Sequence, residues 1–412
     1  MDFAADVARA ERRMRSVFER TPLQRNDFLS AKYEANIYLK REDLSPVRSY
    51  KIRGAFNAIV KALDEGSKGP FVCASAGNHA QGVAYVCAHF GVKAVIYMPV
   101  TTPKQKVHKT RSFGGASVEV RLEGDYFDET LSAAQAYCAK AGAVFVPPFD
   151  SDDVIEGQAS VAAEIMAQMP EDEAIDLLVL PVGGGGLAAG LTRYLADEPI
   201  SFRFVEPAGG PSLKASLEAG ALTTLPKVDS FVDGAAVARI GERNFAALAH
   251  VPANHVLIAP EDRICTTMIE MLNIEGVVLE PAGALAIDGL KDIDNLKGKT
   301  VVAIVSGGNF DFERLPDVKE RALRYAGLKK YYILRMPQRP GALKDFLGIL
   351  GPDDDIARFE YLKKSARNFG SVLIGIETRS PSGFARIEAE MTAQGFAFED
   401  ITDNATLANF IV

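Results

Sequence analysis

A lysine opens a helical pattern early in the chain, where its residue type and position favour covalent chemistry. Lys51 follows the turn at 44–48 and begins an apolar pattern that includes Phe56 and Ile59. The first turn of a helix is the positive end of its dipole, which disfavours an ammonium group. A lysine nucleophile works only when its charge is suppressed, and the neighbouring Tyr50 could cover a flat ring. The pattern suggests a neutral amine or an imine, whereas the alternative is an ordinary surface lysine.

A second stretch has small and polar residues where a buried strand meets a helix. It reads Ser75-Ala76-Gly77-Asn78-His79 and precedes the helical pattern at 80–90. Small residues let the backbone approach a ligand, and the N–H groups at a helix start attract an anion such as a substrate carboxylate. The alternative is a plain turn with a helix cap at Ser75 or Asn78. His79 is either a catalytic base or, more in keeping with its type, a buried hydrogen-bonded histidine.

Four consecutive glycines follow the strand expected at 175–182. The run Gly183-Gly184-Gly185-Gly186-Leu187 presents a ring of bare amides that suits a phosphate group. A dinucleotide fingerprint is the alternative, because Gly184, Gly186 and Ala189 fit its spacing and Glu206 ends a later strand. Both interpretations stay open on this stretch alone.

Two further polar residues occur late in the chain. Ser306 follows the strand expected at 301–305 and offers a hydroxyl group, although a turn cap would account for it equally well. Glu280 begins the sequence Glu-Pro-Ala-Gly-Ala, and such a carboxylate is commonly solvated or ion-paired.

The elements that position these residues alternate between strands and helices. Strands are expected at 37–40, 71–74, 94–98, 118–120, 144–146, 175–182 and 301–305, and helices at 4–19, 51–63, 80–90, 103–113, 125–141 and 157–169. This alternation predicts an α/β fold with parallel sheets covered by helices on both faces. We expect two lobes with a cleft between them, the smaller at about 55–155, in a catalytic domain at 1–327.

The pattern changes after the helix expected at 317–326, and a second domain is predicted at 328–412. Strands at 331–335, 356–362, 371–377 and 396–401 alternate with helices in the order βαββαβ, which is the ferredoxin-like arrangement. A polar turn joins the second and third strands. Leu343, Phe346, Leu347 and Leu350 are spaced as one apolar helix face.

Composition excludes several classes of protein. The 412 residues carry a formal net charge of -8, which argues against a nucleic-acid partner. Four scattered cysteines form no C-x-x-C pair, so we expect no metal site and a reducing compartment, the cytoplasm. The charged N-terminus has no apolar core of a signal peptide, and glycines interrupt the apolar segment 177–191, so no membrane partner is expected. The open edges of the small C-terminal sheet suggest a homo-oligomer, a dimer or tetramer.

A lysine amine, a glycine-lined phosphate site, an asparagine loop and a late serine together suit one cofactor. Pyridoxal phosphate needs a lysine that forms a Schiff base, a phosphate site and a partner for its ring nitrogen. Here the chain resembles the threonine dehydratases (threonine ammonia-lyases) of the tryptophan-synthase-β fold group. The matching stretches are 38–44, 49–55, 75–82, 183–187, 280–284 and 306–309, and the tail resembles the single ACT-like regulatory domain of the short biosynthetic form.

The resemblance implies a role for each matching residue. Lys51 resembles the Schiff-base lysine, Asn78 the partner of the cofactor's 3-hydroxyl, and Ser306 the ring-nitrogen partner. Gly183, Gly184, Gly185, Gly186 and Leu187 resemble the phosphate site, and Ser75, Ala76, Gly77, Asn78 and His79 the substrate loop. Tyr50 stands where the family usually has phenylalanine. Ala76 stands where related serine racemases have a second serine, so racemisation is not expected.

The implied reaction converts L-threonine to 2-oxobutanoate and ammonia, the first step of isoleucine biosynthesis, with isoleucine as effector. L-serine is the alternative substrate, through a serine dehydratase or a related β-elimination. A non-catalytic amino-acid sensor is an alternative of another class.

Overall fold

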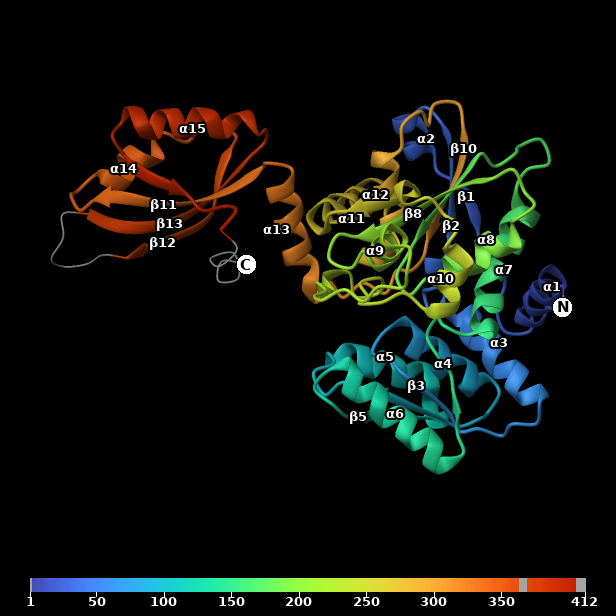
Figure 1. The fold of residues 1–412 in the computed structure, drawn as a ribbon. Helices are drawn as coiled ribbons and strands as arrows, with labels where there is room; N and C mark the ends of the chain where they lie inside the picture. Colours follow the sequence, from blue (N-terminus) through green and yellow to red (C-terminus); the bar gives the residue numbers. More distant parts are fainter. Residues whose placement is uncertain (1, 363–368, 405–412) are drawn as a thin grey trace. The chain divides into compact units, whose positions relative to one another are not determined.

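The computed structural model describes residues 2–362 and 369–404, and the chain forms two compact units, Met1–Phe310 and Asp311–Val412 (Figure 1). The turn expected at 363–368 lies outside the described residues. Helix α13 falls in the second unit, whereas the sequence places the domain boundary after this helix.

The larger lobe of the first unit is built on a six-stranded sheet of order β1-β2-β10-β7-β8-β9. All neighbouring strands are parallel except β1, which runs antiparallel to β2. Its strands are β1 (Leu23–Arg25), β2 (Asn36–Arg41), β7 (Leu177–Pro181), β8 (Ser201–Pro207), β9 (Val256–Ala259) and β10 (Thr300–Val305). Its helices are α1 (Phe3–Met14), α2 (Asp27–Tyr33), α7 (Asp152–Gln168), α8 (Gly186–Tyr194), α9 (Ser212–Ala219), α10 (Glu242–Leu248), α11 (Glu261–Glu275) and α12 (Pro281–Gly289).

The smaller lobe has a parallel four-stranded sheet of order β5-β4-β3-β6. Its strands are β3 (Phe71–Ala74), β4 (Ala94–Met98), β5 (Val118–Leu122) and β6 (Val144–Phe145), and its helices are α4 (Asn78–His89), α5 (Lys104–Gly114) and α6 (Phe127–Ala141). Helix α3 (Lys51–Asp64) packs against α4 and also against α7 of the larger lobe. The predicted two-lobed α/β fold is therefore confirmed.

A buried ionic cluster fixes the start of α3. The Arg53 guanidinium lies 2.8 Å from the Glu42 carboxylate and 2.7 Å from that of Glu164, and Lys40 lies 2.7 Å from Glu164. The side chains of all four residues are fully buried. Buried charges are tolerated only when they are paired and hydrogen-bonded, so the cluster ties β2, α3 and α7 together two residues from Lys51.

The second unit has the predicted βαββαβ order and an antiparallel sheet of order β12-β13-β11-β14. Its elements are α13 (Leu315–Tyr325), β11 (Lys329–Pro337), α14 (Ala342–Leu347), β12 (Asp354–Leu362), β13 (Phe369–Thr378), α15 (Ser382–Ala393) and β14 (Ala397–Asp400). The predicted apolar face at 343–350 is wrong in part. Leu343 and Leu347 are 42% and 45% exposed, because the face of α14 that packs on the core carries Ala342 and Phe346 instead.

Candidate active site

The predicted site residues meet where strands of both lobes end. Lys51 follows β2, Asn78 follows β3, Gly183 follows β7 and Ser306 follows β10. Parallel strands place their carboxyl ends at one edge of a sheet, where ligands of α/β proteins bind. All four residues belong to the first unit.

The Lys51 amine lies between two aromatic rings. Nζ is 5.3 Å from the centroid of Tyr50 and 5.7 Å from that of Phe149, and it donates a hydrogen bond of 2.9 Å to the Pro148 carbonyl. Burial lowers the pKa of Lys51 to about 8, although the charge of Glu280 acts in the opposite direction. The environment therefore favours the neutral amine that a nucleophile or base requires.

The four glycines form a tight turn that no other residue type would fit. A Cβ atom at Gly183 would lie 2.8 Å from the Ala235 backbone, and one at Gly186 would lie 2.9 Å from the Phe149 carbonyl oxygen. Gly185 has φ of 87°, in the left-handed region, and caps the start of α8. The Gly184 carbonyl accepts 2.6 and 3.1 Å hydrogen bonds from the Asn244 side chain and the Gly241 amide. The turn is held rigidly, with the amides of a helix N-terminus beside it.

The Ser75 to His79 loop is ordered by hydrogen bonds of its own. The Ser75 hydroxyl accepts a 3.2 Å bond from the Gly77 amide, and Ala76 packs against the core of the smaller lobe. His79 is 3% exposed, and its Nε2 lies 2.8 Å from the Val146 carbonyl, to which it donates. Burial lowers the pKa of His79 to about 3, so the imidazole is neutral at physiological pH. These contacts fit a structural histidine better than a catalytic base.

Ser306 is buried beside the Lys51 stretch. Its hydroxyl donates a 3.1 Å hydrogen bond to the Ala282 carbonyl, and its own carbonyl accepts one of 3.1 Å from the Tyr50 amide. Rotation about the Cβ–Oγ bond would let the same hydroxyl donate to another acceptor in the site. The Ser306 hydroxyl is neutral, so a basic nitrogen that accepts a hydrogen bond from it can remain unprotonated.

Glu280 is buried and interacts with Asn78, which the sequence alone did not indicate. The Asn78 amide nitrogen donates a 2.6 Å hydrogen bond to Glu280 Oε1. Burial, together with the charge of Asp233, raises the pKa of Glu280 to about 7, although the bond from Asn78 acts in the opposite direction. Glu280 is therefore not a solvated carboxylate, as its local sequence suggested, but a buried group of the site.

Several other site residues could not be recognised from the sequence. Phe149 follows a short strand in a Pro-Pro-Phe-Asp segment, and its ring lies near both Lys51 and Gly184. Asn244 comes from α10 and supports the glycine turn. Asn309 and Lys109 extend the hydrogen bonds around Asn78. Two sequence signals could have indicated two of these residues: the Pro-Pro pair before Phe149, and the 306–309 stretch that contains Asn309.

Glu206 decides between the two interpretations of the glycine run. Its carboxylate is fully buried and accepts bonds of 2.7 and 2.9 Å from the amides of Leu213 and Lys214 at the start of α9. Both oxygens are used within the protein, so neither faces a ribose. The structure disfavours the dinucleotide interpretation.

The site fits pyridoxal phosphate on the evidence of its own shape. A Cβ atom at Gly183, Gly184 or Gly186 would collide with protein atoms, so the chain turns tightly into the start of α8, whose N-terminal amides suit a phosphate. The Phe149 ring lies near both this turn and the Lys51 amine. Within 2–362 and 369–404, no group of three or more histidine, cysteine or acidic residues is arranged to hold a metal ion. The same residues contain no helix long and apolar enough to cross a membrane.

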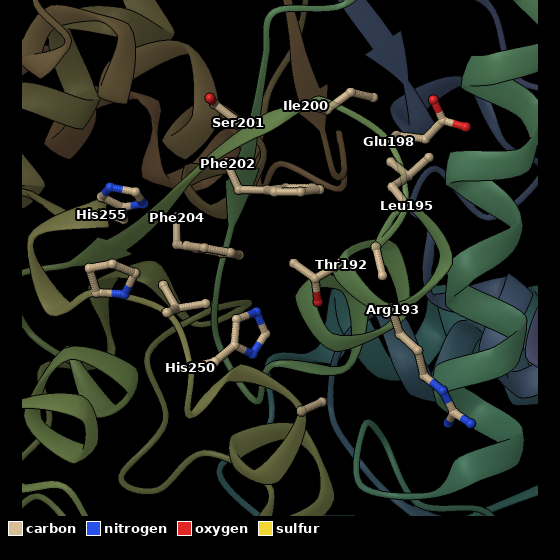
Figure 2. A pocket seen from close by; sticks show the side chains of 14 residues that line it. Thr192, Arg193, Leu195, Glu198, Ile200, Ser201, Phe202, Phe204, His250 and His255 are labelled. Atoms are coloured by element: carbon tan, nitrogen blue, oxygen red, sulfur yellow. The ribbon is translucent and has the colours of Figure 1, made fainter.

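A separate cavity of about 610 Å³ lies at the other end of the larger sheet, near the start of β8 (Figure 2). The stacked rings of Phe202 and Phe204 project into it, and His250 and His255 stand at its margin. It contains none of the predicted site residues.

Comparisons with known proteins agree with this geometry. Residues 15–307 match the family model of pyridoxal-phosphate dependent enzymes, and residues 320–411 match the C-terminal regulatory domain of threonine dehydratase. L-threonine dehydratase biosynthetic IlvA of Halalkalibacterium halodurans is 45% identical over 99% of this chain and 98% of that protein. The corresponding protein of Bacillus subtilis is 43% identical over 98% and 96%. Threonine deaminase isoform 2 from Solanum lycopersicum superposes with a TM-score of 0.71 at 36% identity, covering 78% of this chain and 92% of that chain.

The fold and the site define a pyridoxal-phosphate-dependent enzyme with a C-terminal regulatory domain. The identities over nearly the full length are more specific, and the chain belongs to the family of biosynthetic threonine dehydratases.

Proposed function

We propose that this chain converts L-threonine to 2-oxobutanoate and ammonia. The observation that carries the proposal is the geometry of the Lys51 amine, which lies near the Phe149 ring that also packs on the tight glycine turn at the start of α8. Pyridoxal phosphate, when bound, supplies a conjugated ring that accepts the electron pair left on the substrate Cα.

The residues of the site hold the cofactor and move the substrate proton. Lys51 holds the cofactor and then acts as the base that takes the Cα proton, which a neutral amine can do. Gly183 to Leu187 bind the phosphate through backbone amides, and Tyr50 and Phe149 enclose the amine. Asn78 donates toward the cofactor's 3-oxygen, and Ser306 offers a neutral hydroxyl to its ring nitrogen.

Elimination balances simply. The Cα proton goes to Lys51, and the β-hydroxyl leaves as water with one proton, which the Lys51 ammonium can supply as it returns to the neutral amine. The released enamine tautomerises to an imine, and its hydrolysis consumes one water and yields ammonia and the oxo acid. Ala76 provides no hydroxyl on the loop to return a proton to the opposite face of Cα, which favours elimination over racemisation.

The test is a substrate panel on the purified protein loaded with pyridoxal phosphate. L-threonine should give 2-oxobutanoate and ammonia in equal amounts, with L-serine slower and D-amino acids inert. Faster turnover of L-serine would make L-serine the assigned substrate. If neither amino acid yields an oxo acid, the protein would instead be interpreted as a non-catalytic amino-acid sensor.

We also propose that isoleucine regulates the enzyme through its second unit. A cavity of about 400 Å³ there is lined by Leu343, Leu347, Phe359 and Tyr361, with Arg339 and Lys344 at its margin. This lining suits a branched side chain together with a carboxylate. An effector acts only through different affinities for two states, and a coupling of about 1–3 kcal/mol is typical.

Threonine turnover measured against isoleucine concentration tests this site. Leu347→Asp should weaken inhibition while turnover without isoleucine stays intact, and the exposed Tyr325→Asp, outside the cavity, is the matched control. Equal inhibition of both variants would move the effector site elsewhere. The exposed Phe359 and Tyr361 on the edge strand β12 further support a homo-oligomer, which sedimentation would measure.

A further inference from the structure

Asn78 can serve the cofactor in two opposite ways, because its amide presents an oxygen acceptor or an NH₂ donor. Which group faces the ligand depends on the hydrogen-bond network around the amide. Three side chains from distant parts of the chain, those of Lys109, Asn309 and Glu280, determine this orientation in the structure.

The chain of bonds begins at Lys109 on α5. Its ammonium, which can only donate, contacts Asn309 Oδ1. The Asn309 nitrogen then donates 2.8 Å to the Val47 carbonyl, which can only accept, and 2.6 Å to Asn78 Oδ1. Two independent partners therefore fix the Asn309 amide, and its nitrogen must face Asn78.

The chain ends at Glu280. With its oxygen occupied by Asn309, Asn78 turns its nitrogen to Glu280 Oε1 at 2.6 Å. One of the two amide hydrogens makes this bond, and the second remains for a ligand. Every bond runs in one direction, from a cation through two amides to a carboxyl group.

The Glu280 carboxyl bonds to Asn78 and does not cap its own helix. It stands at the N-cap of α12, but it makes no hydrogen bond to the first helical amides. A Cβ atom at Gly307 would collide with the Glu280 carboxyl, so a glycine there leaves room for it.

We propose that Glu280 is a positioning residue that, as the last acceptor of the Lys109–Asn309–Asn78 chain, holds the Asn78 amide so that its second hydrogen donates toward the cofactor's 3-oxygen. This inference rests on the proposed cofactor role of Asn78. It assigns Glu280 no contact with substrate, and its effect on cofactor affinity passes through Asn78, whereas its charge acts separately on the pKa of Lys51.

The test reads the cofactor rather than turnover. Apoprotein is titrated with pyridoxal phosphate, and both the dissociation constant and the pH midpoint of the visible absorption band are measured. Loss of a hydrogen bond to a charged group weakens binding about tenfold or more, so Glu280→Ala should raise the dissociation constant by about that factor. The lost bond shifts the midpoint upward, against the downward shift that follows from removing the charge of Glu280 near Lys51. Glu280→Gln keeps an acceptor oxygen and should have a smaller effect.

A double-mutant cycle separates positioning from a general structural role. Once Asn78 is replaced by alanine, Glu280→Ala should leave the dissociation constant unchanged and move the midpoint only downward, because its charge near Lys51 is removed. A further rise of the dissociation constant in the double variant would overturn the proposal. Asp233→Asn is the matched control, because it removes a neighbouring carboxylate outside the chain of bonds. Circular dichroism confirms that each variant folds. Absence of a visible band in the unaltered protein would refute the cofactor assignment itself, a different failure from an unchanged band in Glu280→Ala.

Discussion

The lowered pKa of Lys51 predicts how fast the apoprotein captures its cofactor at each pH. Imine formation with the aldehyde needs the neutral amine, so the rate should rise with pH and level off near the pKa of about 8. At pH 8 half of such an amine is neutral, against about one in three hundred for a lysine at its ordinary value of 10.5. The structure therefore predicts capture roughly 150-fold faster than by an exposed lysine at pH 8.

The effect of the Glu280 charge on the pKa of Lys51 provides a second test of this prediction. Its charge raises the pKa of Lys51 against the effect of burial. Glu280→Gln removes this charge, so the amine should be neutral at lower pH and the capture curve should move in that direction. Lys51→Ala is the control and should show no imine band at any pH.

Stopped-flow absorbance of apoprotein mixed with pyridoxal phosphate, from pH 6 to 10, measures the curve. A rate that keeps rising toward pH 10 would show that Lys51 is not desolvated, and the reasoning from burial would be refuted. If the rate levels off near pH 8 and Glu280→Gln does not move this plateau, burial still explains the lowered pKa of Lys51. Glu280 would then have no measurable effect on that pKa.

Three further changes test the site and its support. Gly184→Ala should weaken cofactor binding at least tenfold, since its Cβ would collide with the Phe149 ring; cofactor titration measures this, and unchanged affinity would contradict the phosphate assignment. Ser306→Asp should protonate the ring nitrogen, slow elimination and increase side reactions at Cα; an unaltered spectrum and rate would oppose that role. Glu164→Gln should lower the thermal unfolding midpoint of the apoprotein, because Lys40 and Arg53 lose a shared carboxylate and breaking a buried ion pair costs about 3–5 kcal/mol. An unchanged midpoint would show that the cluster rearranges to compensate for the lost charge.

Local sequence determined much of this protein. Alternation of strands and helices is a short-range property, so the two lobes and the βαββαβ tail were predictable, as was Lys51 at the first position of α3. The glycine run predicted a site for a phosphate group, but its spacing left the dinucleotide fingerprint open as an alternative. Short-range patterns failed at α14, where periodicity alone could not show that Leu343 and Leu347 remain exposed.

Tertiary structure decided which groups interact across long distances in the chain. Glu206 looked like a ribose ligand by spacing, and only the fold shows its carboxylate bound to the start of α9. Asn78 and Glu280 belong to different lobes, and nothing in either local sequence indicates that they meet. The direction of a side-chain amide and the pKa of a buried amine depend on neighbours and on exclusion of water, and only the folded chain provides both.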